Sequence, residues 1–319
     1  MLIANRVSLH SESFIIIITP YSMDSKPESR NGLSASGKPL VTQTTSAAVP
    51  NTQVFHFGDW IITITKAPIM SSQCLCAKES SIASIASHQS GNCVPGSGGR
   101  CVFCRNEARF TLKYLPDMVF VENSLRIENA KTQSGIEFNA VDAVNSIGEQ
   151  PSGDIQVASA SVWQESRTEA LKTYGSKTVQ YDWTYTPDYR GSVFGTMHSQ
   201  PTVEELDLEL LKRRDAVLLF DEIQLYGDEL DDNGCSEMDL KIRIVDSYVF
   251  VLMRFYLRVD HVFVRLYDTR LLLKKGENFM LREYAVRESK IPDLPKSVSP
   301  MDPMQIWSAL SPLKTFMKS

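Results

Sequence analysis

Five cysteines lie between residues 74 and 104, and their thiols are the side chains of this sequence best suited to chemistry. Cys101 and Cys104 form a CxxC pair, Cys74 and Cys76 form a CxC pair, and Cys93 lies between them. Thiolates bind a tetrahedral zinc ion well, but zinc modules usually carry paired CxxC units at regular intervals. Because this spacing is irregular, we favour free, reduced thiols in an inserted loop. A zinc-stabilised module or zinc enzyme that uses these cysteines is the alternative.

A second metal-like pattern is the acidic run ELDDNG at residues 229–234. It imitates the start of an EF-hand loop, which needs Asp at its first position and a bidentate Glu at its twelfth. Those positions hold Glu229 and Leu240 here. Since Asn233-Gly234 is a typical hairpin pair, we predict a turn between two strands, with no metal and no cofactor.

Catalytic motifs do not occur in the linear sequence. The five histidines are scattered, and we find no HExxH zinc motif, GxSxG elbow, P-loop or GxGxxG after a strand. We therefore expect a protein that is not an enzyme.

Two polar stretches interrupt otherwise apolar elements. Asp268-Thr269-Arg270 breaks an alternating strand, where Asp is disfavoured unless it is exposed or paired. An internal Asp–Arg pair and a binding role both fit. Residues 163–169 (WQESRTE) place charges beside a Trp. The Trp could anchor the segment while its charged end faces solvent, or the segment could contact another protein.

Strand patterns dominate the chain, with period-two alternation bounded by turn residues. Residues 249–252 are apolar at every position, which indicates a strand covered on both faces. Good hairpin turns lie at 231–234 and 275–278. The predicted strands are 54–65, 124–128, 136–139, 155–163, 181–185, 238–245, 248–259, 262–273 and 279–287.

Two helices are predicted. Thr202 and Glu205 form a capping box before a leucine-rich run, which indicates a helix over 203–221. A short helix at 139–147 would have Asn139 as its cap and Asp142 in its first turn, where the helix dipole favours a carboxylate.

The domain prediction follows composition. Residues 21–53 are rich in Ser, Thr, Pro, Gly and Asn and carry few large apolar side chains, so we expect 1–53 to form a disordered N-terminal extension. Residues 54–291 form one globular domain with a low-complexity Cys/Gly-rich insertion at 71–109, and 292–319 form a C-terminal tail. The expected fold class is α+β, with a largely antiparallel β-sheet or sandwich core and flanking helices.

Charge and hydropathy narrow the function class. A net charge of −5 and a pI near 5.6 argue against a nucleic-acid partner. No run approaches the ~20 apolar residues that span a membrane, and no export signal is evident. We expect a cytoplasmic protein, with access to the nucleus, that meets another protein.

Ten words of this sequence occur in the same order in a known family, over about residues 55–70 and 115–291. On these words the chain resembles the TIP-forty-one-like family (TOR signalling pathway regulator-like). The words are FGDW 57–60, LPDMVF 115–120, GIEFNA 135–140, WQESRTE 163–169, YDWTYT 181–186, DEL 228–230, KIR 241–243, DTR 268–270, MLREY 280–284 and RESK 287–290.

The resemblance implies a compact α+β fold that binds type 2A-family protein phosphatase catalytic subunits, including their C-terminal tails, in TOR signalling. It implies partner-binding roles for Asp142, Leu206, Leu266 and Asp268. Inhibition and a role in biogenesis both remain open. The chain departs from the family in its first 50 residues and in the 71–109 insertion, which replaces a charged helical stretch.

The implied mechanism is a groove that holds an extended segment of the phosphatase. Leu206 and Leu266 would supply apolar contacts, while Asp142 and Asp268 would orient donor groups of the partner. From sequence we expect Asp268→Asn to weaken phosphatase capture and to leave thermal stability nearly unchanged. An adaptor for unrelated partners would show no preference for these phosphatases.

Overall fold

A computed structural model gives the fold. It describes residues 50–70, 102–112, 115–147, 155–157, 177–179, 187–230 and 233–318. The predictions for 1–49, for Cys74, Cys76, Cys93 and Cys101, and for the words at 163–169 and 181–186 lie outside these residues. Across the ranges just given, no helix has the length and apolarity needed to cross a bilayer.

An eight-stranded antiparallel sheet forms the larger layer, in the order β3-β10-β11-β12-β13-β14-β15-β9. Five of its strands, β10 to β14, follow one another as long hairpins, so most pairs are neighbours in sequence. The strands are β3 (Met118–Val119), β9 (Gln200–Pro201), β10 (Val217–Asp228), β11 (Gly234–Val245), β12 (Tyr248–Val259), β13 (Phe263–Lys274), β14 (Leu281–Lys290) and β15 (Leu313–Lys318).

A smaller, five-stranded antiparallel sheet has the order β1-β2-β4-β5-β8. Its strands are β1 (Asn51–Phe57), β2 (Trp60–Lys66), β4 (Ser124–Asn129), β5 (Ser134–Asn139) and β8 (Ser192–Phe194). A separate two-stranded pair joins β6 (Ile155–Val157) to β7 (Lys177–Val179).

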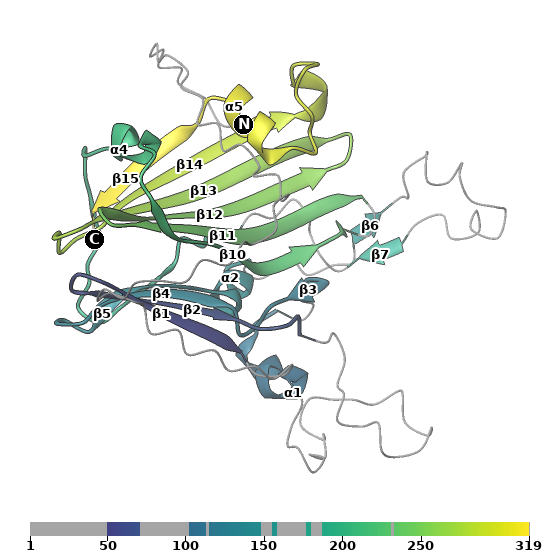
Figure 1. The fold of residues 1–319 in the computed structure, drawn as a ribbon. Coiled ribbons are helices and arrows are strands. Elements are labelled where there is room, and N and C mark those ends of the chain that lie inside the picture. The colour runs from purple at the N-terminus through teal and green to yellow at the C-terminus, as the bar shows by residue number, and fades with distance from the viewer. Residues whose placement is uncertain are drawn as a thin grey trace, which may run out of the picture.

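The two sheets form two layers, with the smaller sheet lying along one face of the larger one (Figure 1). Alternate side chains of the long strands in both sheets meet between the layers in a single apolar cluster. Ile62 and Phe138 come from the small sheet, and Leu240, Val251 and Phe255 from the large one; all are buried. The prediction of a largely antiparallel β core is confirmed.

In the part of the chain that the structure describes, the helices are few and short. They are α1 (Val102–Asn106), α2 (Ala140–Asn145), α4 (Leu208–Lys212) and α5 (Pro303–Ala309), with 3-10 turns η2 (Glu107–Arg109) and η5 (Ile291–Asp293). The prediction for α2 is confirmed, since the Asn139 side chain accepts a hydrogen bond from Asp142 N.

The predicted helix over 203–221 is wrong in most of its length. Only Leu208–Lys212 is helical, its N-cap is Asp207 rather than Thr202, and Val217 already begins β10. The leucines of this run fit both helical and strand spacing. From Val217 onward, a long hydrogen-bonded ladder with β11 decides for the strand.

The first predicted strand, 54–65, is two strands. Gly58 adopts a positive φ of 60°, which favours glycine, and the chain turns back there so that Trp60 pairs with Phe57. The predicted hairpin turn at 275–278 is confirmed, with Gly276 at φ 85° and Glu277 N donating to Lys274 O at 3.2 Å.

Residues 292–319, predicted from sequence as a tail, contribute α5 and the strand β15, which pairs with β14. Frequent prolines suggested irregular chain, but Pro303 occupies the first turn of a helix, where a missing N–H costs nothing. The Asp302 carboxylate accepts from Met304 N and Gln305 N and so caps that helix.

Candidate functional site

The side of the large sheet that faces away from the small sheet, here called the outer face, carries the candidate site. Two segments cover its ends. Leu206 and Leu211, from the α4 segment, pack in a cluster with Tyr248, Leu272 and Leu281 at one end.

At the other end, residues 291–310, here called the C-terminal segment, lie on the outer face. Ile306 of α5 is fully buried in a cluster with Tyr256, Val264 and Leu266. Figure 1 shows α5 above the ends of β13 and β14, on the side opposite the small sheet.

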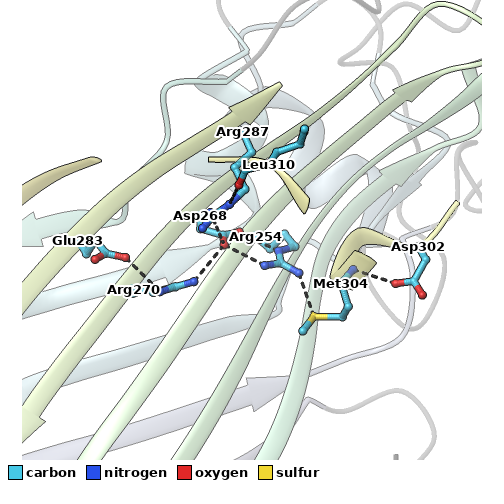
Figure 2. A network of polar contacts seen from close by, with 8 residues as sticks. All are labelled: Arg254, Asp268, Arg270, Glu283, Arg287, Asp302, Met304 and Leu310. Carbon is cyan, nitrogen blue, oxygen red and sulfur yellow. Dashed lines mark hydrogen bonds and ion pairs between the residues drawn. The ribbon is translucent and has the colours of Figure 1, made fainter. Parts of the chain in front are cut away.

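Beneath α5 lies a buried group of charges, the arginine cluster, made of Arg254, Asp268, Arg270, Glu283 and Arg287 (Figure 2). Arg254 and Asp268 are directly paired across β12 and β13, and Arg270 and Glu283 across β13 and β14. Arg254 donates two hydrogen bonds to the Asp268 carboxylate, at 2.7 and 2.8 Å. Arg270 donates to Glu283 Oε1 at 3.1 Å.

Within the arginine cluster three guanidinium groups face two carboxylates, and a third carboxylate, that of Asp239 on β11, is paired directly opposite Arg254 and interacts with it. Each of the five side chains is at most 9% exposed. Arg287 Nη1 lies 3.9 Å from Asp268 Oδ2, and it has no hydrogen-bond partner. Burial lowers the pKa of Arg287 to about 10; Asp268 opposes this shift, whereas Arg270 and Arg254 add to it. Arg287 is thus the least compensated cation of the group.

The C-terminal segment closes the arginine cluster without supplying a charge to it. The Trp307 ring lies between two guanidiniums, 4.9 Å from Arg270 and 4.7 Å from Arg287. Met304 Sδ is 3.4 Å from Arg254 Nη1, and Leu310 O accepts from Arg287 Nε at 3.1 Å. These are cation–π and weak polar contacts, which offset the burial of a cation less well than a carboxylate does.

Between α4 and α5 the outer face is partly open and mixes apolar with charged side chains. Phe250 and Leu252 are half-buried there beside Lys241 and Arg243, and Phe220 on the neighbouring strand is 54% exposed. Such a strip suits an extended peptide, which needs apolar contacts and polar groups in alternation.

The chain is similar to known proteins of one family. The TIP41-like family matches residues 118–295, more than half of the chain. The chain belongs to the TIP41-like family. A TIP41-like protein of Rattus norvegicus is 37% identical over 246 residues, covering 76% of this chain and 79% of the relative.

Other members of the TIP41-like family match over shorter lengths. The Homo sapiens TIP41-like protein is 44% identical over 184 residues, covering 56% of this chain and 66% of the relative. The Saccharomyces cerevisiae protein named type 2A phosphatase activator TIP41 is 37% identical over 195 residues, covering 56% of this chain and 54% of its own length.

The structure brings together two of the four residues predicted from the family resemblance. Leu266 and Asp268 point to the same face of β13, and both are fully buried beneath the C-terminal segment. Leu206 is also on the outer face but belongs to the cluster of Leu272, six residues along β13 and therefore roughly 20 Å away.

Asp142 lies elsewhere, on α2, whose buried residues join the core between the sheets. Its carboxylate accepts from Asn139 Nδ2 at 2.9 Å and from Ser192 Oγ, which ties α2 to β8. Partner contacts by these four residues stay a prediction. The internal Asp–Arg pair considered from sequence is present, between Asp268 and Arg254.

Sequence reasoning missed Arg254 and Arg287 as members of this group. Arg254 stands in the apolar strand β12, and an arginine inside such a run is itself a signal, because a buried cation needs a counter-charge. Its partner, Asp268, can be identified only once the register between β12 and β13 is known. No group of three or more metal-ligating side chains occurs in the described part of the chain.

The burial of Asp268 overturns the expectation that Asp268→Asn leaves stability unchanged. Asn would leave Arg254 without its carboxylate and would raise the excess positive charge of the arginine cluster. We expect the free energy of unfolding, measured with urea, to fall by about 3 kcal/mol or more. Asp246→Asn, at a side chain 86% exposed, is the control and should change it by less than about 0.5 kcal/mol. Equal unfolding midpoints for the two variants would contradict this assignment.

Asp239 gives a pH-dependent prediction. Burial raises the pKa of this carboxyl from 3.8 to about 6, although Lys241 and Arg254 oppose the shift. The protonated form therefore stabilises the fold below pH 4, and this contribution is lost as the pH rises through 6. Asp239→Asn should increase stability at pH 7 by on the order of 2 kcal/mol and change it little at pH 4. Urea unfolding at both pH values tests this, and a gain of equal size at both would refute it.

Proposed function

We propose that this protein is a non-catalytic regulator that binds the catalytic subunit of type 2A-family Ser/Thr protein phosphatases. Membership of the TIP41-like family supports the proposal, because relatives in Saccharomyces cerevisiae and Schizosaccharomyces pombe are named type 2A phosphatase activators. In this proposal the chain contributes a surface, and the phosphatase performs the chemistry.

The observation that carries the proposal is the partly open strip on the outer face. Apolar floor residues Phe250 and Leu252 lie beside Lys241 and Arg243, and long antiparallel strands fix all four. A rigid sheet gives such a site little conformational entropy to lose on binding. Lys241 pairs with Glu222 at 3.2 Å and Arg243 donates to Leu211 O at 2.8 Å, so the strip offers polar groups of both charges to a partner segment.

We further propose that the bound segment is the C-terminal tail of the phosphatase. A tail is extended and accessible, and a strip between two covering segments accommodates one extended chain better than a folded surface. Action within TOR signalling, in the cytoplasm with access to the nucleus, completes the proposed role. The names of the fungal relatives favour activation over inhibition as the outcome of binding.

A substitution at Phe220 tests this surface. Phe220→Ala removes an exposed ring at the side of the strip, and we expect about a tenfold loss of affinity for a purified type 2A catalytic subunit, about 1.4 kcal/mol. Val262→Ala is the matched control, since Val262 is 53% exposed in the turn before β13 and should not alter binding. Affinity is measured by calorimetry, with a type 1 phosphatase catalytic subunit as the specificity control.

Three results would count against the proposal in different ways. No affinity of the unaltered protein for the type 2A subunit would remove the function itself. Equal binding of the type 1 subunit would indicate a general adaptor. Equal affinities of the Phe220 and Val262 variants would show that the phosphatase contacts a surface other than the strip.

A further inference from the structure

The arginine cluster and its cover fit each other incompletely. Arg254 has Asp268 and Asp239 opposite it on its two neighbouring strands, whereas Arg287 lies 3.9 Å from Asp268. The C-terminal segment adds the Trp307 ring, the Met304 sulfur and the Leu310 carbonyl. The acidic residue at the start of α5, Asp302, directs its oxygens to Met304 N, Gln305 N and Gln305 Nε2 of its own helix. Arg287 Nη1 and Trp307 Nε1 are buried without a hydrogen-bond partner.

Buried donors without a partner, and a buried cation without a close counter-charge, are costly. A ligand that placed a carboxylate beside Arg287 would supply both the missing charge and an acceptor. A ligand aromatic ring in the place of Trp307 would keep the stacking on both guanidiniums. The site is therefore better matched to an aromatic, acidic peptide than to the segment that fills it.

The contacts of α5 also allow it to leave the arginine cluster without unfolding the sheet. α5 has seven residues, too few for a helix to persist without its packing. Its only fully buried side chain is Ile306, and Met304 at its edge is exposed. The segment starts after β14 and ends before β15, and these strands are paired with each other. Lifting α5 would therefore leave the sheet intact and hold α5 nearby at high effective concentration.

We propose that α5 is an internal ligand of the arginine cluster, and that a partner peptide bearing an aromatic side chain and a carboxylate displaces it. This inference rests on the proposed function, because the phosphatase tail is the partner considered. It adds a second step: the strip receives the peptide first, and displacement of α5 then uncovers the adjoining charges.

Hydrogen exchange on the unaltered protein tests the displacement directly. The probe is a synthetic peptide from the C-terminal tail of a type 2A catalytic subunit that contains an aromatic residue and a free carboxylate. We expect saturating peptide to increase exchange at the amides of residues 303–310 and to leave β13 protected. Unchanged or slower exchange at 303–310 would overturn the inference, even if the peptide binds.

Weakening the cover should raise affinity. We expect Trp307→Ala to bind the same peptide about tenfold more tightly. This gain corresponds to a cluster that is uncovered about a tenth of the time in the unaltered protein and permanently in the variant. Met301→Ala, in the same segment but 70% exposed, is the matched control and should bind like the unaltered protein. Amidation of the peptide carboxylates should abolish the gain, since the Arg287 contact would be lost.

The results separate this inference from the function on which it rests. If the unaltered protein binds the phosphatase and Trp307→Ala binds no better, α5 is not a competitor and the function stands. If no form binds the phosphatase, both are wrong. Circular dichroism checks that Trp307→Ala folds, and if it does not, hydrogen exchange on the unaltered protein decides alone.

Discussion

The buried pair between Arg254 and Asp268 is the interaction on which the outer face depends. A carboxylate with no exposed surface is tolerated only when its oxygens are satisfied, and here a guanidinium does so with two short hydrogen bonds. The pair requires β12 and β13 to hold one register, because a shift of one residue would turn Asp268 towards the apolar core between the sheets. The charges thus specify strand alignment at a place where apolar packing alone would accept alternatives. The same requirement calls for a cover, which the C-terminal segment provides.

The two faces of the large sheet carry different tasks for this reason. The inner face is apolar and packs on the small sheet, which supplies stability through buried area. The outer face is partly polar, and among the residues that the structure describes, short segments cover its two ends. Packing of the inner face against the small sheet therefore also fixes the positions of the side chains on the outer face. This arrangement holds charged side chains in fixed positions on the outer face.

The sequence predicted the strands well where two local signals agreed. For β12 and β13, long apolar or alternating runs end at turn residues, so both limits were correct to within a residue. The sequence-based prediction failed where one pattern is compatible with two structures. The leucines around α4 fit a helix or a strand, and the prolines near α5 fit irregular chain or the start of a helix. The site was harder to predict from the sequence, because Arg254 and Asp268 are 14 residues apart and meet only through the hairpin of β12 and β13. Resemblance to a family named candidate residues, but it could not show that Leu266 and Asp268 are covered.

That cover changes how a binding residue should be understood in this fold. A side chain can matter for partner recognition while being buried in the free protein, provided that the element above it is held by few contacts. The cost of exposing the arginine cluster is limited, because its cover contributes a ring and a carbonyl rather than a counter-charge. In the displacement that we propose, Asp268 would have one role in both states: it would keep the three guanidiniums in place, first beneath Trp307 and then beneath an acidic ligand. Stability and recognition are thereby coupled through a single carboxylate, so loss of binding on its substitution would report both effects together.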